Sequence, residues 1–158
     1  MFRKLVRSNK QIPIEECIAL LTKETRGILS VNGDDGYPYG MPMNHFYSPE
    51  DHCIYFHCGR SGHRLDSLKR SNKASFCVCE QGSKEDGDWA YRVRSVIVFG
   101  RVEMIDDLHM VRHIARKLSY KFTQDEAYIQ TEMDRYAAAA ILLKLQPEHI
   151  CGKVVQES

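Results

Sequence analysis

The sequence predicts a mostly β protein with flanking helices, folded as a closed or partly closed antiparallel barrel. Strand-like apolar runs joined by hairpin turns dominate the chain, and no repeated strand–helix–strand unit is visible, which argues against a doubly wound sheet. With 158 residues, of which 43% are hydrophobic, the chain is long enough for one domain with a proper core. We therefore expect a single domain over residues 1–158.

The first half of the chain alternates strand patterns with turns. Pro13 suits an early helical position and precedes apolar residues at helical spacing, which predicts a first helix at residues 13–23. Residues 32–36 are Asn, Gly and Asp, a composition typical of a hairpin turn. Pro38 and Pro42 follow, so the strand that leaves this turn cannot pair fully along both edges. The expected strands of this half are residues 27–31, 37–47, 53–58 and 73–80, with a second helix at 62–70.

The second half is expected to hold one long strand, two helices and the closing strand. Residues 89–105 form a long strand pattern that is bent near Gly100. Asp106 or Asp107 precedes a helical apolar pattern and is expected to cap that helix. A further helix is expected at 125–136, then a strand at 139–145 that ends at Pro147, and a short final strand at 150–155.

The nearly neutral net charge argues against partners that are held by a large surface of one charge, such as nucleic acids and anionic membranes. The formal net charge is +1, so we expect no nucleic-acid partner and no membrane surface, and any basic site must be local. No apolar run approaches the length of a membrane span, and the N-terminus lacks the apolar stretch of a signal peptide. We therefore expect a cytoplasmic protein.

The six cysteines are expected to be reduced thiols packed as small apolar residues. Cys77 and Cys79 would share one face of a strand, and a metal site that adds His57 and Cys58 is a second reading of the same residues. However, the spacing matches no standard zinc pattern and contains no paired CxxC unit. We therefore predict no metal.

Residues 56–68 carry the strongest local signal for a ligand. They lead from a strand pattern into a helix, and they combine small residues with the cationic or potentially cationic side chains of Arg60, His63 and Arg64. A helix N-terminus offers unpaired N–H groups and a partial positive charge. A cation in the first turn opposes that dipole, so Arg64 fits a bound anion better than the ordinary role of a solvated helix residue. The segment therefore predicts a clamp for a phosphate-bearing cofactor.

Seven short motifs together resemble a known family. In chain order they are GILS at residues 27–30, DGYPY at 35–39, MPMN at 41–44, IYFHC at 54–58, GHRLD at 62–66, RSVIVFG at 94–100 and ICGK at 150–153. Each motif is weak alone, but their order and spacing resemble the FMN-binding split-barrel group that includes pyridoxamine 5′-phosphate oxidase. The chain looks closest to the branch of the nitroimidazole-resistance flavoproteins. The resemblance covers about residues 27–153 and implies a six-stranded antiparallel split β-barrel that binds FMN.

The resemblance also implies which residues hold the flavin. The strand at 41–45 would lie along the isoalloxazine mostly through backbone groups, and the end of the next strand would lie beside the ribityl chain and the phosphate. A basic pair at the start of the second helix would bind the phosphate, and a polar residue of the long strand would reach the flavin. The cofactor-binding residues implied in this way are Met41, Pro42, Met43, Asn44, His45, Phe56, His57, Cys58, Gly62, His63, Arg64 and Ser95.

The function implied is that of an FMN-dependent oxidoreductase that reduces a small aromatic or nitro-type compound, with NAD(P)H or another donor as reductant. The family further implies a homodimer with a flavin between subunits. His57, and after it His45, is a candidate proton donor because the pKa of histidine lies near neutral pH. Trp89 and Tyr91 could stack over a substrate, although burial in the core is their ordinary role.

The chain departs from the family pattern at two places: the first shifts more of the phosphate's charge onto Arg64, and the second argues against oxidation of pyridoxamine phosphate. His63 stands where the oxidases have a permanent cation, and the basic substrate-binding C-terminal segment has no evident match. The residues are also compatible with a non-catalytic flavin-binding sensor or storage protein, and with a haem or metal protein that uses His45, His57 and the cysteines. An absorbance spectrum would separate flavin from haem.

Overall fold

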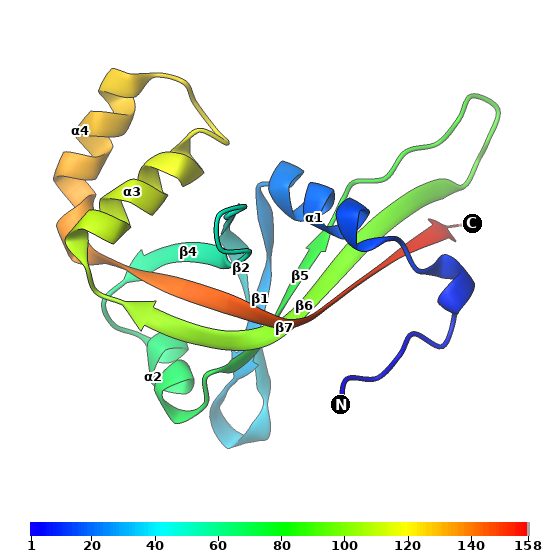
Figure 1. Ribbon diagram of the computed structural model, residues 1–158, viewed down its shortest axis with the longest axis horizontal. Coiled ribbons are helices and arrows are strands. Elements are labelled where there is room, and N and C mark those ends of the chain that lie inside the picture. The colour runs from blue at the N-terminus through cyan, green and yellow to red at the C-terminus, as the bar shows by residue number, and fades with distance from the viewer. Residues whose placement is uncertain (158) are drawn as a thin grey trace.

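A strongly curved antiparallel sheet forms the body of the protein in the computed structural model, which describes residues 1–157 (Figure 1). Residue 158, the last of the expected domain, lies outside the described residues. The strands are β1 (Arg26–Asn32), β2 (Pro38–Asn44), β3 (Phe46–Tyr47), β4 (Ile54–Gly59), β5 (Lys73–Cys79), β6 (Tyr91–Ile105) and β7 (Ala140–Glu157). The helices are α1 (Ile14–Lys23), α2 (His63–Arg70), α3 (Leu108–Ser119) and α4 (Glu126–Tyr136), with short 3₁₀ helices η1 (Ser8–Lys10), η2 (Asp34–Gly36) and η3 (Ala137–Ala139).

The strands follow the order β2-β1-β5-β6-β7-β4-β3, and every pair of neighbours is antiparallel. The sheet curls into a half-barrel with helices around it (Figure 1). The predicted fold class, a mostly β split barrel with flanking helices, is therefore confirmed. The strand number differs, because the described residues form seven strands where six were expected.

The additional strand arises at His45, where the expected strand 37–47 breaks in two. β2 pairs with β1, whereas β3 pairs with β4, so the chain passes at His45 from one end of the strand order to the other. The His45 ring is fully buried, and its backbone N–H donates to the carbonyl of Thr25 at 3.3 Å. The break therefore brings the two ends of the curled sheet together.

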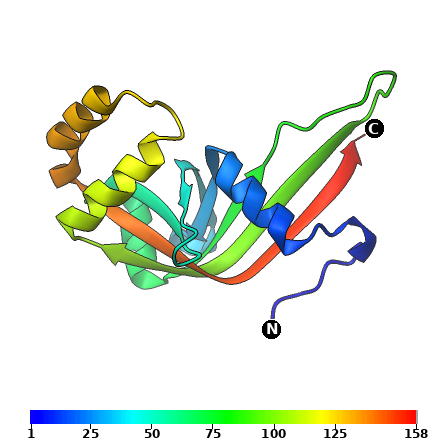
Figure 2. The same ribbon diagram turned by 45° about the horizontal axis from the view of Figure 1, so that its top comes forward.

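The two longest strands, β6 and β7, run side by side through the whole molecule (Figure 2). The prediction that the last strand ends at Pro147 is wrong, because β7 continues through it to Glu157. Pro147 lies opposite Gly100, next to a shift in register between Phe99 and Gly100, and a proline is tolerated at such a bulge. A Cβ on Gly100 would come within 2.1 Å of the Gln146 carbonyl oxygen, so only glycine allows this close approach. The irregularity stands where the sequence predicted a bend.

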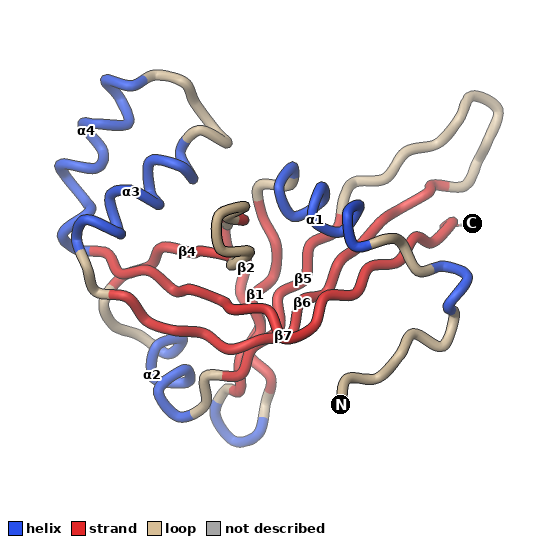
Figure 3. The backbone as a smooth tube through the Cα atoms, viewed as in Figure 1, coloured by secondary structure: helices blue, strands red, loops and turns tan. Residues whose placement is uncertain are grey.

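The helices cover different parts of the sheet (Figure 3). α1 packs against β3, β6 and β7, α2 packs against β1, and α3 and α4 stand together over one end of the sheet. Asp107 caps α3 by accepting from Met110 N at 2.7 Å, and Asp125 caps α4 by accepting from Tyr128 N at 3.0 Å. Across residues 1–157, no helix combines the length and the apolar character needed to cross a membrane.

Two apolar clusters result from this arrangement. The larger one fills the inside of the curved sheet and includes Phe56 and Phe76, whose rings meet edge to face at 4.9 Å. The smaller one lies between α3 and the strands β4 and β7, and includes Tyr55 and Val111. The α3–α4 pair is thus anchored on the sheet by its own cluster, separate from the interior of the barrel.

Candidate functional site

The two ends of the strand order meet along an open line, which we call the seam. It is formed by β2 and by residues 56–59 of β4; among residues 1–157, β2 pairs only with β1 and residues 56–59 pair only with β7. Two hollows of about 240 and about 270 Å³ lie along the seam. The first joins Tyr39 of β2 to residues 58, 59 and 61–65, and the second joins Pro42, Met43 and Asn44 to His57. The sequence therefore brings two distant motifs, MPMN and IYFHC, to one surface.

Arg64 lies in the first hollow without an acidic partner. Its Nε donates to Met41 Sδ at 3.0 Å, and its guanidinium also reaches the thiol of Cys58. Burial raises the pKa of Cys58, and the charge and hydrogen bond of Arg64 oppose that rise. In the part of the chain that the structure describes, no carboxylate forms an ion pair with Arg64. A half-buried guanidinium with only sulfur neighbours retains most of its capacity to bind an anion.

The start of α2 faces the same hollow with unused backbone donors. Gly62 precedes the helix at φ +123° and ψ 171°, a conformation that a residue with a side chain rarely adopts. Its carbonyl accepts from Leu65 N and Asp66 N, whereas the amides of His63 and Arg64 have no acceptor within residues 1–157. A Cβ built on Gly59 or Gly62 would meet no atom within 4 Å. Both glycines therefore leave open space beside the helix N-terminus.

The other two basic residues predicted for the clamp already have acidic partners. His63 stacks on Tyr39 with ring centroids 4.2 Å apart, and its Nε2 lies 3.2 Å from Asp34 Oδ2. Arg60 forms an ion pair with Asp106 and donates to the Ala140 carbonyl at 3.4 Å. His63 still lines the hollow, whereas Arg60 is committed to the start of the α3 segment.

The second hollow contains a hydrogen-bonded pair, Arg26 and Asn44, of which the sequence predicted only Asn44. Arg26 lies opposite Asn44 in the β1–β2 register, and its Nε donates to Asn44 Oδ1 at 2.9 Å. Asn44 was predicted, but Arg26 was missed; its only signal is its position opposite Asn44 once the hairpin register is known.

His57 also lines the second hollow. Its ring reaches the surface, but it sits in a concave wall of protein. Partial burial in that wall is the main cause that lowers the pKa of His57, and the charge of Arg64 adds to it. The ring is therefore neutral at neutral pH and can donate one hydrogen bond and accept one.

Several predicted site residues do not present their side chains along the seam. Met41, Met43 and Phe56 belong to the core of the barrel, so only their backbones could face a ligand. The His45 ring is buried, with Nε2 donating to the Leu21 carbonyl at 2.7 Å, and burial together with the charge of Lys121 lowers its pKa to about 4. Ser95 is paired with Cys79 and Lys153 near the far end of β6, three strands from β2, or about 14 Å at the usual strand spacing.

Within residues 1–157, no three His, Cys, Asp or Glu side chains gather closely enough to hold a metal ion. The thiols of Cys17, Cys53, Cys58, Cys77 and Cys151 are free. His45, one of the two histidines considered for haem, is enclosed in the core, so its ring offers no nitrogen to a ligand at the surface.

The fold is similar to that of several solved structures. A candidate 5-nitroimidazole antibiotic resistance protein from Bacteroides thetaiotaomicron VPI-5482 shares 21% identity over 93% of this chain and 87% of its own, with a TM-score of 0.77. An FAD and haem binding protein from Mycobacterium smegmatis shares 20% identity over 92% of this chain and 73% of its own, with a TM-score of 0.71. An FAD-binding protein from Mesorhizobium loti shares 22% identity over 92% of this chain and 97% of its own, with a TM-score of 0.66. At these identities the likeness establishes the fold alone.

No curated protein matches the sequence. The family comparison is more decisive, because a family model described as pyridoxamine 5′-phosphate oxidase matches residues 13–154. This span runs from the start of α1 to near the end of β7 and includes both hollows of the seam. The chain therefore belongs to the pyridoxamine 5′-phosphate oxidase family.

Proposed function

We propose that the protein is an FMN-dependent oxidoreductase whose flavin lies along the β2–β4 seam. The observation that carries the proposal is Arg64, a half-buried cation with sulfur neighbours and without an acidic partner in the described chain. A phosphate at this place would supply the missing negative charge and accept charge-assisted hydrogen bonds from the guanidinium. The donors at the start of α2 point to the same chemistry, because a helix N-terminus favours anions.

The residues present fit a phosphate-bearing flavin in size and in order. Gly59 and Gly62 leave the space that a phosphate needs beside the amides of His63 and Arg64. From Tyr39 in the first hollow to Asn44 in the second, β2 extends over about 17 Å, comparable to the extended length of FMN. The phosphate would thus lie at α2 and the ring between Pro42, Asn44 and His57.

In the second hollow, the protein would bind the flavin ring and fix its orientation. Asn44 and Arg26, held together by their hydrogen bond, would face the polar edge of the ring, where a cation favours negative charge on the reduced form. When bound, FMN would supply the transfer of electrons from a donor such as NAD(P)H to the acceptor. We propose His57 as the proton donor to that acceptor. Because its pKa is lowered, the protonated fraction grows as the pH falls, and turnover limited by this proton should rise toward acidic pH.

The substrate we propose is a small aromatic or nitro-type compound. The likeness to a candidate 5-nitroimidazole antibiotic resistance protein supports this choice, within a family whose model matches most of the chain. The free thiols of Cys17, Cys53, Cys58, Cys77 and Cys151, together with a reductant such as NAD(P)H, fit the cytoplasm, where we propose that the protein works.

We further propose a homodimer. The outer face of the sheet carries exposed or half-exposed apolar side chains on four neighbouring strands, and a second copy would cover them. They are Ile28, Cys77, Ile97, Phe99 and Cys151. Ser95 lies on this face, too far from the seam of its own chain to touch a flavin there, so it would reach the cofactor of a second copy. Light scattering should give twice the chain mass, and a monomer would exclude this part of the proposal.

The experiment that tests the function is a spectrum followed by an assay. Purified protein incubated with equal amounts of FMN and FAD, then freed of unbound flavin, should keep the two broad flavin bands, and mass spectrometry should find FMN rather than FAD in the released cofactor. With NADH or NADPH, the loaded protein should reduce nitrobenzene faster than the same concentration of free FMN does. Flavin binding without turnover would favour a sensor or storage protein. A single intense Soret band after incubation with haem, without flavin binding, would favour a haem protein, for which only His57 of the two histidines is accessible.

A further inference from the structure

The α3–α4 pair borders a cleft that adjoins the flavin site and extends beyond it. We infer that this cleft binds the substrate, and that the substrate is a planar aromatic molecule that is neutral or positively charged. The inference rests on the proposed function, because it places the substrate beside the ring end of the seam. It concerns the apolar space of about 270 Å³ between the two helices and the strands β4 and β7, which we call the arm cleft.

The arm cleft and the seam share two residues. Asn44 and His57 line both the arm cleft and the second hollow of the seam. A ligand in the arm cleft would therefore contact the same histidine that faces the ring end of the seam. This continuity distinguishes the arm cleft from the large polar pocket beside Glu80 and Arg94, which shares no residue with the seam.

The walls of the arm cleft are suited to an aromatic ring. Both helices contribute apolar side chains to its floor, among them Val111, Leu118 and Ile129. Phe122 and Tyr128 stand at the cleft with more than half of each residue exposed, 52% and 57%. Exposed aromatic residues beside an apolar hollow are favourable partners for stacking on a flat ligand.

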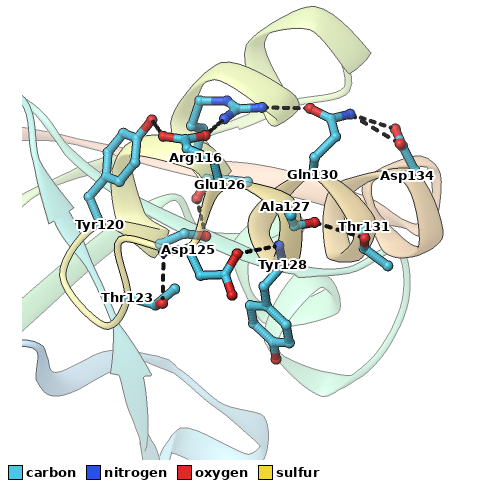
Figure 4. Close-up of polar contacts among 12 residues, drawn as sticks. Arg116, Tyr120, Thr123, Asp125, Glu126, Ala127, Tyr128, Gln130, Thr131 and Asp134 are labelled. Atoms are coloured by element: carbon cyan, nitrogen blue, oxygen red, sulfur yellow. Dashed lines mark hydrogen bonds and ion pairs between the residues drawn. The ribbon is translucent and has the colours of Figure 1, made fainter.

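A network of polar side chains joins α3 to α4 (Figure 4). Arg116 of α3 forms an ion pair with Glu126 and donates to Gln130 at 2.6 Å, both on α4. Gln130 in turn donates to Asp134, and Tyr120 donates to Glu126 at 2.6 Å. The ring of Tyr128 extends away from this network (Figure 4) and lines the arm cleft. The polar groups thus hold the helices together while the apolar side chains remain available to a ligand.

The lining also selects the charge of the ligand. Among the residues that line the arm cleft, Glu132 is the one carboxylate, there is no Lys or Arg, and His57 is neutral at neutral pH because its pKa is lowered. Glu132 has Arg135 as a loose partner, with 3.7 Å between the charged atoms, and can turn to a basic ligand. An anionic aromatic compound would place its charge beside Glu132, and no lysine or arginine lines the arm cleft to balance that charge. The volume suits a small molecule, since a helix or strand from a second copy would need a far longer groove.

The test uses benzamidine and benzoate, two flat probes of nearly equal size and opposite charge. Each is titrated into the flavin-free full chain, and the amide NMR signals are followed. We expect benzamidine to shift the signals of residues around the arm cleft, and benzoate to bind about tenfold more weakly or not at all. Tyr128→Ala should weaken the affinity for benzamidine several-fold. Tyr91 is a similarly exposed tyrosine at the other end of the molecule, so Tyr91→Ala should leave that affinity unchanged. Glu132→Gln should reduce the preference for benzamidine over benzoate.

Four results would overturn the inference: equal affinity for both probes, shifts confined to other surfaces, no effect of Tyr128→Ala, or arm-cleft shifts that follow protein concentration instead of the probe. The last would mean that a second copy covers the arm cleft. FMN titration of the same samples keeps this result separate from the proposed function. If the protein binds flavin but not benzamidine, the arm cleft is not the substrate site, and the proposed flavin site stands. If it binds benzamidine but not flavin, the arm cleft is an aromatic site, and the proposed oxidoreductase function is wrong.

Discussion

Arg64 and Arg94 are both half-buried arginines, but their surroundings differ completely. They lie at opposite ends of the molecule, Arg64 on α2 and Arg94 near the start of β6 (Figure 1). Arg94 donates to both carboxylate oxygens of Glu80 at 2.9–3.0 Å, and its Nη1 lies 3.4 Å from Glu16. Its hydrogen bonds lower the pKa of Glu80. Arg64 has only sulfur atoms as side-chain partners in the described chain.

Arg94 is therefore a structural cation, whereas Arg64 is available to a ligand. The charge of Arg94 is matched within the fold, so the region around it can serve stability without any added group. The charge of Arg64 is unmatched and lies beside open space and free amides, so its natural partner comes from outside the chain. The comparison predicts that substitutions at the two sites have opposite consequences for stability and for binding.

The largest expected effect is that of Arg64→Ala on the flavin. Loss of the charge-assisted hydrogen bonds should weaken FMN binding by about 1.5–3 kcal/mol, measured by quenching of flavin fluorescence. Unfolding in urea should change little, because no carboxylate in the described chain loses its partner. Arg64→Lys should retain part of the affinity. An unchanged dissociation constant for FMN in Arg64→Ala would remove the phosphate assignment.

His45 also carries an unmatched polar atom, because its Nδ1 has no hydrogen-bond partner, but this atom is enclosed in the core. Burial, followed by the charge of Lys121, lowers the pKa to about 4, so the unfolded state binds more protons than the folded state below about pH 6.5. Stability should therefore fall as the pH drops from 7 to 5, by on the order of 2 kcal/mol from this residue. His45→Gln can still donate to Leu21 but cannot titrate, so its urea unfolding should depend less on pH. An equal pH slope in both proteins would contradict the assignment.

Gly62→Ala tests whether the start of α2 must have its observed backbone. An added Cβ at Gly62 meets no atom, so the expected cost of about 1–2 kcal/mol comes from backbone strain at φ +123°. Both the free energy of unfolding and the affinity for FMN should fall. The matched control is Gly87→Ala, at φ +89° and equally free of contacts, which should lower stability without changing FMN binding. Equal effects of the two variants on FMN would count against a special role of the α2 terminus.

The smallest expected effect comes from Arg94→Ala. Glu80 would lose its side-chain partner but keep the hydrogen bond from the backbone N–H of residue 94 at 2.9 Å. The side chain of Glu80 is 12% exposed and that of Arg94 is 34% exposed, so water screens part of the pair and we expect a loss of about 1 kcal/mol in unfolding free energy. FMN affinity should stay the same. A weaker FMN affinity together with unchanged stability would reverse the roles of the two arginines.

Much of the fold could be predicted from local signals. Asp107 caps α3, as one of the two predicted caps, and α4 begins one residue after its predicted start at Asp125, because caps and helical apolar patterns depend only on neighbouring residues. The break at His45 and the passage of β7 through Pro147 could not, because burial and a bulge between distant strands decide them.

The candidate site divides in the same way. The anion site at Arg64 could be predicted from the sequence, because a cation in the first turn of a helix is unfavourable beside the helix dipole unless an anion binds there. The pairing of Arg60 with Asp106, and that of Arg26 with Asn44, depends on the register of the sheet and on packing between distant segments. Side chains on β2 alternate between core and surface, so the motif MPMN contains both core and site residues.

The most direct test of the central claim compares FMN with riboflavin, which differs from it only in lacking the phosphate. The wild-type protein should bind FMN at least about tenfold more tightly than riboflavin, about 1.4 kcal/mol, and Arg64→Ala should bring the two affinities close together. Equal affinities in the wild-type protein, or an undiminished preference for FMN in Arg64→Ala, would contradict that claim.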